Sequence, residues 1–376
     1  MTDRQTSSVA EIVRVRGRSR PDHTALVLGD RRVSGGELLD RAAQMAQALS
    51  AAGVGADDRV AFLDENGIEH FEVFFGAAML NAVCVDVNRR LAAPEVQFIV
   101  DDADAKVLIV GPDFVPILDE IAEQLPKVTT FVVIGADHGI HELYEVWSTR
   151  HPAIDPGVGS DPDDTAFQLY SSGTTGRPKG VMLSNANFFS LLSMAKEIWE
   201  LDESSVNLTT MPLFHIGGGG WAMGGMYEGC TSVILRELDP AALIELIELI
   251  ELIELIELIE HERITHALLV PAVLQFMLMV RAVEAADYSS LEVCVYGASP
   301  ISEEALAACV EMFKPCRFWQ AYGLTETTGA VVNLPPEDHD PAGANRHRLR
   351  SRCGARRRTA DRRRRRRDGS AGRGGR

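Results

Sequence analysis

Residues 170–181 combine three glycines, four Ser or Thr hydroxyl groups and one lysine, Lys179. Glycine lets the backbone approach a ligand closely and adopt positive φ. Successive amide N–H groups and hydroxyls can surround an anion, and lysine adds a point charge that suits phosphate. The segment therefore predicts a polyphosphate-binding loop. It differs from a Walker A loop, because Lys179 lies between Pro178 and Gly180 instead of preceding Ser or Thr. The alternative is a flexible linker with a solvated lysine.

Three further segments accompany this loop in chain order: residues 211–218 (Met-Pro-Leu-Phe-His-Ile-Gly-Gly), 296–302 (Tyr-Gly-Ala-Ser-Pro-Ile-Ser) and 320–327 (Gln-Ala-Tyr-Gly-Leu-Thr-Glu-Thr). The four together resemble the signature motifs of the adenylate-forming (AMP-binding) superfamily, which includes acyl-CoA synthetases, luciferases and peptide-synthetase adenylation domains. By this resemblance they are the phosphate loop, the acyl-pocket segment, the adenine-side loop and the Tyr-Gly-x-Thr-Glu motif. The run at 212–218 most resembles bacterial long-chain fatty-acid–CoA ligases.

The resemblance implies a two-step ligation. A carboxylate attacks the α-phosphorus of ATP to give an acyl-adenylate and pyrophosphate, and the thiol of CoA then displaces AMP. The first step joins two anions, so the site must neutralise charge and align the attack. Mg²⁺ takes oxygen ligands and usually only one or two protein groups. The expected partners are therefore ATP, CoA, Mg²⁺ and a small-molecule carboxylic acid, with a fatty acid favoured.

The same resemblance assigns roles to positions in this sequence. The residues expected to bind the nucleotide are Ser171, Ser172, Gly173, Thr174, Thr175, Gly176, Lys179, Gly297, Ala298, Ser299, Gln320, Ala321, Tyr322, Gly323 and Thr325. Those expected to line the acyl pocket are Phe214, His215, Gly217 and Gly218. Catalytic roles are expected for Lys179, Thr325 and Glu326, and the metal ligands are expected to be Ser171 and Glu326.

Each assignment has a plainer alternative. Glu326 could be an exposed turn carboxylate, and residues 297–302 could be a strand-to-helix turn with Ser302 as N-cap. Both interpretations of that turn can hold together. His215 could be a structural residue, and we expect it to border the pocket without acid–base duty.

Strand-like and helix-like segments alternate along the chain, which predicts an α/β fold of two doubly wound, largely parallel βαβ lobes. The lobes are expected at about residues 1–155 and 156–344, and together they would form the AMP-binding N-terminal domain. Ligands in such folds bind at the carboxyl ends of strands. The expected strands are Ala25–Leu28, Arg59–Leu63, Val83–Val87, Lys106–Val110, Thr130–Ile134, Thr165–Tyr170, Val206–Met211, Ser232–Leu235, His266–Val270 and Leu291–Tyr296.

Composition narrows the class of protein. Of the 376 residues, 46% are hydrophobic and 24% charged, as in an ordinary globular protein. No apolar run is long enough to span a membrane, and the N-terminus carries no signal-peptide core. These features predict a cytoplasmic protein. The six cysteines are scattered without a Cys-x-x-Cys pair, so we expect buried thiols and neither disulfides nor a zinc site.

Residues 245–260 repeat Glu-Leu-Ile. A three-residue step falls about 60° short of a full helical turn, so the glutamates should wind around the helix and leave no clean apolar stripe. We expect a surface helix lengthened by repeat expansion, which would protrude or buckle. A partner-binding or membrane-surface helix is the alternative.

The chain changes character near its end. Residues 345–376 hold 15 arginines and two aspartates, whereas residues 1–344 hold 22 basic and 52 acidic side chains. The arginine-rich stretch is expected to be disordered and foreign to the family, and a frameshift is favoured over a nucleic-acid-binding or membrane-binding arm. The acidic body makes specific nucleic-acid binding unexpected.

The C-terminal domain that the resemblance implies, with its lysine and ribose-binding aspartate, is not found, so we expect a truncated ligase with impaired activity. The alternatives are an enzyme that adenylates another acyl or aryl acid, and a non-catalytic remnant or binding protein acting through the arginine tail. The sequence makes no prediction of oligomeric state.

Overall fold

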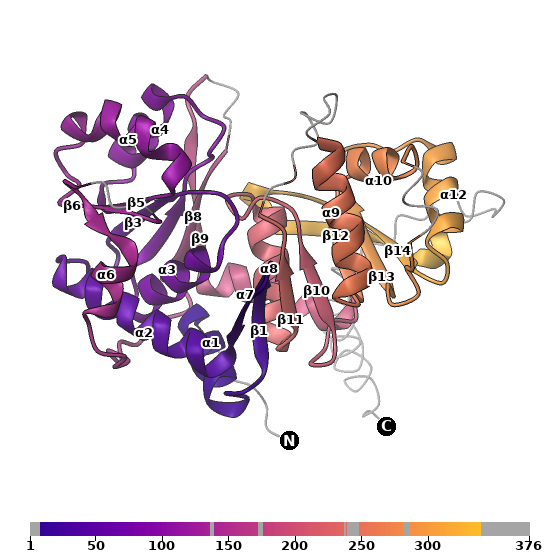
Figure 1. Ribbon diagram of the computed structural model, residues 1–376, viewed down its shortest axis with the longest axis horizontal. Coiled ribbons are helices and arrows are strands. Elements are labelled where there is room, and N and C mark those ends of the chain that lie inside the picture. The colour runs from indigo at the N-terminus through magenta and orange to yellow at the C-terminus, as the bar shows by residue number, and fades with distance from the viewer. Residues whose placement is uncertain are drawn as a thin grey trace, which may run out of the picture.

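The computed structural model describes residues 8–135, 139–171, 176–236, 238, 248–280 and 286–339. Within these ranges the chain forms two mixed β-sheets separated and flanked by helices (Figure 1). The α/β fold class expected from the alternating pattern is confirmed, and each expected strand is present with slightly shifted ends. None of the described helices combines the length and the apolar character needed to cross a membrane.

The first sheet has seven strands in the order β7-β6-β5-β3-β4-β8-β9. All of its pairs are parallel except the last, in which β9 runs antiparallel to β8. The bounds of the strands along the chain are β3 Arg59–Leu63, β4 Val83–Asp86, β5 Ala105–Val110, β6 Thr130–Val133, β7 Glu142–Leu143, β8 Thr165–Ser171 and β9 Lys179–Ser184.

The second sheet has eight strands in the order β15-β14-β13-β12-β10-β11-β1-β2, with antiparallel hairpins at both edges and parallel pairs between them. Its strands are β1 Thr24–Leu28, β2 Arg31–Ser34, β10 Val206–Thr209, β11 Thr231–Ile234, β12 His266–Leu269, β13 Val293–Gly297, β14 Arg317–Leu324 and β15 Gly329–Leu334.

Sheet membership does not follow the expected division of the chain into residues 1–155 and 156–344. The N-terminal hairpin β1–β2 pairs with β11 and so completes the second sheet, while β8 and β9 complete the first. The reason is strand pairing over long separations, which a linear reading of composition does not reveal. The two sheets are therefore interlocked through the chain.

Helices form three layers around the sheets (Figure 1). The central group shares one hydrophobic core with residues of both sheets and comprises α1 Val9–Ser19, α2 Gly35–Ala51, α3 Ile68–Met79, α7 Asn185–Glu197 and α8 Ile216–Glu228. One outer layer, α4 Ala93–Asp102 and α5 Val115–Ile121, covers the first sheet. The other covers the second sheet with α9 Glu248–His261, α10 Pro271–Met277 and α12 Glu303–Met312.

The remaining elements are short. The helix α6 Tyr144–Thr149 packs against α2. The part of the chain that the structure describes also holds four 3₁₀ turns: η1 Pro112–Phe114, η2 Ala122–Gln124, η3 Thr325–Thr327 and η4 Pro336–Asp338.

Helix starts follow local sequence rules where polar caps are present. Ser34 accepts a hydrogen bond from the amide of Glu37 at 3.1 Å and begins α2. Ser302 does the same for α12, accepting from the Ala305 amide at 3.2 Å. The N-cap interpretation of Ser302 is thus confirmed.

The Glu-Leu-Ile repeat forms the helix α9, but the expectation that no apolar stripe survives is wrong over its described part. Leu252, Leu255, Ile256 and Ile259 are buried and pack in the core of the second sheet. Their spacing is i, i+3, i+4 and i+7, which is one helical face. Because Leu and Ile are neighbours in every repeat, the buried stripe passes from the Leu positions to the Ile positions as the helix rotates. Residues 245–247 lie outside the described ranges.

Five of the six cysteines lie in the described chain, and all five are buried free thiols, as expected: Cys84, Cys230, Cys294, Cys309 and Cys316. The arginine-rich segment 345–376 lies outside the described residues.

Candidate active site

The two predicted metal ligands meet where the sheets approach each other. Ser171 is the last residue of β8, and Glu326 lies in η3 after β14. The Ser171 hydroxyl donates a hydrogen bond to Glu326 Oε1 at 2.9 Å, across a sequence separation of 155 residues. Segments from different sheets therefore converge at one point, which is the geometry that the motif assignment requires.

The phosphate loop connects the antiparallel strands β8 and β9. Ser171 pairs with Lys179 in their ladder, so the base of the loop is closed by strand pairing. The Lys179 side chain is exposed beside this base. Gly176 has φ +90°, a conformation that favours glycine. Of the predicted loop residues, Ser172, Gly173, Thr174 and Thr175 lie outside the described chain.

A tyrosine near the end of β8 is hydrogen-bonded to a residue of the helix α4. Tyr170 donates a hydrogen bond to Asp102 Oδ2 at 2.7 Å and accepts one from Gln168 Nε2 at 3.3 Å. Burial and the adjacent Asp102 carboxylate raise the pKa of Tyr170 well above its usual range. Our sequence analysis missed this support, because Asp102 ends α4 and no local pattern links it to the loop.

The adenine-side loop begins at the end of β13. A Cβ atom on Gly297 would lie 2.2 Å from the carbonyl oxygen of Ala321, so only glycine allows β13 and β14 to approach as they do. Ala298 follows with φ +66°, an unusual conformation for alanine. Ala298 and Ser299 are exposed. Strain at an exposed loop is often found at binding sites, and here the loop also leads to the N-cap Ser302.

Residues 320–323 form part of the strand β14, which our sequence analysis did not identify. Gln320 and Ala321 are half-buried, whereas Tyr322 is 60% exposed. A Cβ atom on Gly323 would lie 1.7 Å from the Gly329 carbonyl oxygen of β15. The hairpin thus depends on glycine at this position.

The turn η3 presents Glu326 on a fixed backbone. The Thr325 carbonyl accepts a hydrogen bond from the Thr328 amide at 3.0 Å. The Thr327 hydroxyl accepts one from the Leu324 amide at 3.0 Å, and Thr328 has φ +59°. Thr325 and Glu326 therefore occupy a short turn locked at both ends, with the Glu326 side chain exposed.

The predicted acyl-pocket segment leads into α8. Phe214 is buried, and its ring lies 4.6 Å from that of His215, centroid to centroid. A Cβ on Gly218 would lie 2.1 Å from the Pro212 carbonyl oxygen, and one on Gly217 would lie 3.0 Å from Met211 Cε. His215 is exposed at the surface, but many protein atoms lie close to its ring. The resulting desolvation, together with the charge of Arg90, lowers the pKa of His215.

Asn66 holds this segment in place and was not predicted. It follows β3 of the first sheet and is buried. Its Nδ2 donates to the carbonyl oxygens of Met211 at 3.2 Å and Leu235 at 3.1 Å, and its Oδ1 accepts from the Leu213 amide at 3.0 Å. One amide side chain therefore ties the first sheet to the segment that would line the acyl pocket.

Comparison with known proteins gives a family match over most of the chain. The sequence model of the AMP-binding enzyme family matches residues 13–357. The match thus reaches past the limit expected at residue 344 and includes the first part of the arginine-rich segment.

Two curated relatives illustrate the range of similarity. The fatty acid–[acyl-carrier-protein] ligase ScoC of Streptomyces coeruleorubidus is 34% identical over 90% of this chain and 62% of its own length. The long-chain-fatty-acid–CoA ligase FadD13 of Mycobacterium tuberculosis is 32% identical over 78% of this chain and 55% of its own length. The chain therefore spans between about half and two thirds of the relatives that it matches.

Solved structures agree with the fold. The anthranilate CoA ligase AuaEII, in complex with anthranoyl-AMP, superposes with a TM-score of 0.83 at 25% identity, covering 90% of this chain and 64% of that one. The inhibitor-bound N-terminal domain of FACL13 from Mycobacterium tuberculosis superposes with a TM-score of 0.79 at 30% identity, covering 88% and 79%. The described residues thus have the fold of an N-terminal domain of adenylate-forming enzymes.

Proposed function

The chain belongs to the AMP-binding enzyme family, and from this membership we propose that it is an acid–thiol ligase that activates a fatty acid with ATP. The observation that carries the proposal is the contact between Ser171 and Glu326, which joins the phosphate-loop strand to the Tyr-Gly-x-Thr-Glu turn. Two motifs that lie far apart in the sequence thus meet at one place in the fold.

A small set of groups near Ser171 and Glu326 would neutralise the charge of the ATP phosphates. Lys179 stands exposed at the base of the phosphate loop, where its ammonium would bind the pyrophosphate part of ATP. The loop hydroxyls and amides, including Ser171, would hold the β- and γ-phosphates. Thr325 would contact the α-phosphate. These contacts matter most as charge accumulates on the departing pyrophosphate.

The residues present also fit Mg²⁺. Ser171 Oγ and Glu326 Oε1 lie 2.9 Å apart, and adjacent oxygens of a regular Mg²⁺ octahedron with bonds of about 2.0–2.1 Å are separated by roughly the same distance. Ser171 and Glu326 would hold the ion together with phosphate oxygens. When bound, Mg²⁺ would screen phosphate charge so that an anionic carboxylate can approach.

The protein's own groups then align the chemistry. A carboxylate oxygen forms a bond to the α-phosphorus while the bond from that phosphorus to the bridging oxygen of pyrophosphate breaks. Gly297, Ala298 and Ser299 would hold the adenine edge, with Tyr322 packed near it. Phe214, His215, Gly217 and Gly218 would border the acyl chain. Alignment of two bound reactants lowers the entropic part of the barrier.

The acid and the thiol acceptor are the finer parts of the proposal. We propose a fatty acid and CoA because the curated relatives named above act, by their names, on fatty acids, one of them with CoA. An acyl carrier protein is the second candidate acceptor, since it is named in the other relative. An aryl acid is the second candidate substrate, supported by the similarity to an anthranilate CoA ligase.

The deciding experiment is acid-dependent ATP–pyrophosphate exchange with short, medium, long and aromatic acids. We expect exchange that requires an acid and is fastest with a fatty acid. Lys179→Ala should lower it at least about tenfold, because a charge-assisted contact of about 1.5–3 kcal/mol is lost. Lys196→Ala, an exposed lysine of α7, is the matched control and should leave exchange unchanged.

Folded protein that shows no exchange with any acid would contradict the proposed activity. A second assay, thioester formation from chemically prepared acyl-adenylate with CoA or with acyl carrier protein, separates the acceptor from the first half-reaction.

A further inference from the structure

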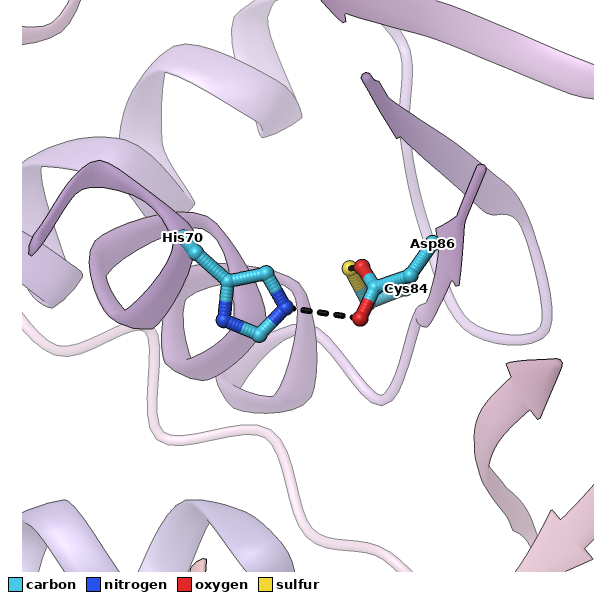
Figure 2. A group of neighbouring side chains, drawn as sticks. All are labelled: His70, Cys84 and Asp86. Atoms are coloured by element: carbon cyan, nitrogen blue, oxygen red, sulfur yellow. Dashed lines mark hydrogen bonds and ion pairs between the residues drawn. The ribbon is translucent and has the colours of Figure 1, made fainter. Parts of the chain in front are cut away.

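Three side chains that can ligate a metal lie together far from the nucleotide motifs in the sequence. His70 comes from the helix α3, and Cys84 and Asp86 come from the strand β4 (Figure 2). Their ligating atoms all lie within 4.8 Å of one another. The sequence predicted no zinc site, because no Cys-x-x-Cys pair is present and this cluster joins three residue types from two elements.

Secondary structure explains the convergence. Successive side chains of a strand point to opposite faces, so Cys84 and Asp86, two residues apart, share one face of the sheet. The helix α3 packs near that face, with His70 in its first turn. Figure 2 shows the imidazole reaching from the helix toward the two strand residues. The cluster therefore lies between a helix and the sheet that it covers.

The cluster is removed from water. The three residues are 2%, 1% and 3% exposed in chain order. The rings of Phe62, Phe71 and Phe74 surround His70 at centroid distances of 5.3, 5.7 and 6.0 Å. A charged carboxylate in such a place is costly unless it is compensated. The charge of the Asp86 carboxylate must therefore be balanced by groups within the cluster or by an ion bound there.

Hydrogen bonds within the cluster compensate only in part. Asp86 Oδ2 lies 2.7 Å from His70 Nε2, and the Cys84 thiol donates to Asp86 Oδ1 at 3.2 Å. His70 Nδ1 is buried and has no partner among the described residues. If Nε2 carries the proton, the Nδ1 lone pair is left unpaired. If Nδ1 carries it, the Nδ1–H has no acceptor among the described residues and the Nε2 lone pair faces an anion. A cation between Nε2 and the carboxylate would turn that repulsion into an attraction.

We propose that His70, Cys84 and Asp86 form a buried binding site for one divalent transition-metal ion of the zinc class. An imidazole nitrogen, a thiolate sulfur and a carboxylate oxygen are all ligand types that zinc accepts. One thiolate, one carboxylate and one neutral imidazole balance the two charges of the ion, so the complete site is neutral. Binding releases the thiol proton of Cys84.

The geometry needs little adjustment. Tetrahedral zinc with bonds of about 2.0–2.3 Å holds its ligand atoms roughly 3.3–3.8 Å apart, and the hydrogen-bonded atoms are 2.7 and 3.2 Å apart. All ligating atoms lie within 4.8 Å of one another, so shifts of about one ångström would bring them to these separations. A small cavity lined in part by His70, Asp86, Asn66 and Phe214 adjoins the cluster, so a water molecule there can supply the fourth ligand.

The expected role is to fix α3 to β4. A metal that binds the folded chain and not the unfolded one stabilises the fold by mass action. None of the three residues belongs to the predicted nucleotide or acyl site, and Phe214 of the predicted acyl pocket meets them only across the small cavity.

The test begins with metal content and cobalt substitution of the wild-type protein. We expect one equivalent of zinc to copurify, or to bind to chelator-treated protein, and to raise the thermal midpoint. Cobalt should give a thiolate-to-cobalt charge-transfer band that saturates at one equivalent, and zinc should abolish it. Protein without copurified zinc that also fails to show this band at stoichiometric cobalt would overturn the proposal.

Variants locate the site. Cys84→Ser, Asp86→Asn and His70→Gln should each lose the equivalent of metal, and Cys84→Ser should lose the charge-transfer band. Cys230→Ser is the matched control, because Cys230 is another buried thiol and donates its hydrogen bond to the Asp202 carbonyl instead. A band that survives in Cys84→Ser would contradict the assignment. If the variants fail to fold, X-ray absorption of the zinc-loaded wild type decides: one sulfur neighbour supports the site, and a shell of nitrogen and oxygen alone overturns it.

Discussion

The two antiparallel hairpins that carry the candidate site differ in how they are built. The hairpin β8–β9 closes the first sheet and carries the phosphate loop, with Lys179 beside the loop base. The hairpin β14–β15 closes the second sheet and carries Glu326 on a locked turn. The first offers a positive charge and glycine freedom, whereas the second offers a carboxylate and rigidity.

This difference teaches how two sheets can share one site. At this end of each sheet the pairs are parallel up to the last strand, and the final antiparallel strand returns the chain along the sheet edge. A hydrogen bond from Ser171 at the end of β8 to Glu326 in η3 links the two hairpins. Predictions that separate the contributions of the two hairpins test this description.

The largest effect is expected from Gly323→Ala in the rigid hairpin. The added Cβ would overlap the Gly329 carbonyl oxygen, and relieving such a clash costs about 3 kcal/mol of unfolding free energy. Urea unfolding measures the loss, and pyrophosphate exchange should fall to background. Gly159→Ala, where nothing lies within 4 Å of the new atom, is the control. An alanine variant as stable as the wild type would show that this hairpin is not held by its glycine.

The second prediction removes the charge from the rigid hairpin. Glu326→Gln keeps the size of the side chain and an oxygen to accept from Ser171, but it loses the anion that would bind Mg²⁺. We expect acid-dependent exchange to fall about a hundredfold, or about 2.7 kcal/mol, with unfolding unchanged because the side chain is exposed. Glu304→Gln on α12 is the matched exposed control. Full activity of Glu326→Gln would remove Glu326 from the proposed metal site.

The third prediction concerns Ser171, the partner of Glu326 on the hairpin β8–β9. Ser171→Ala deletes the donor to Glu326 and should lower exchange about tenfold, since a hydrogen bond to a charged group contributes about 1.5 kcal/mol or more. In the double variant with Glu326→Gln, the loss should be smaller than the sum of the two single losses, because both residues are proposed to hold the same Mg²⁺ ion. Simple additivity would mean that the two residues act separately.

The smallest effect is expected behind the phosphate loop. Tyr170→Phe removes the hydroxyl that donates to Asp102, which should cost about 1 kcal/mol of stability and reduce exchange by less than about threefold. Tyr288→Phe is the matched control, because the buried Tyr288 hydroxyl has no partner among the described residues. A large loss of exchange in Tyr170→Phe alone would assign the tyrosine a direct part in the reaction.

The sequence predicted most of the fold because its signals are local. The buried parallel strands are short apolar runs such as Arg59–Leu63, and the Ser34 cap has its own pattern of spacing. The edge strand β9 and the strand β14 were missed, since Lys179–Ser184 and Arg317–Leu324 contain the glycines and polar residues of the motifs themselves. The motif residues therefore interrupt the apolar pattern by which a strand is recognised in a sequence.

Predictions about the site divide in the same way. Motif residues such as Ser171 and Glu326 were recognisable because their neighbours in sequence identify them. Asn66 and Asp102 were not, because each acts through atoms distant in sequence. The three-residue cluster at His70 is a further example, since its members share a location only after α3 has packed on β4. Long-range pairing is what a single sequence conceals.

During synthesis, the strand β1 of the N-terminal hairpin must wait for its parallel partner β11. Leu26 of β1 pairs with Ser232 of β11, so the partner strand is synthesised about two hundred residues later. At a translation rate of about 5–20 residues per second, this interval lasts roughly ten to forty seconds. During that time the apolar strand β1 lacks its parallel neighbour, so one of its edges stays unpaired until β11 has been synthesised.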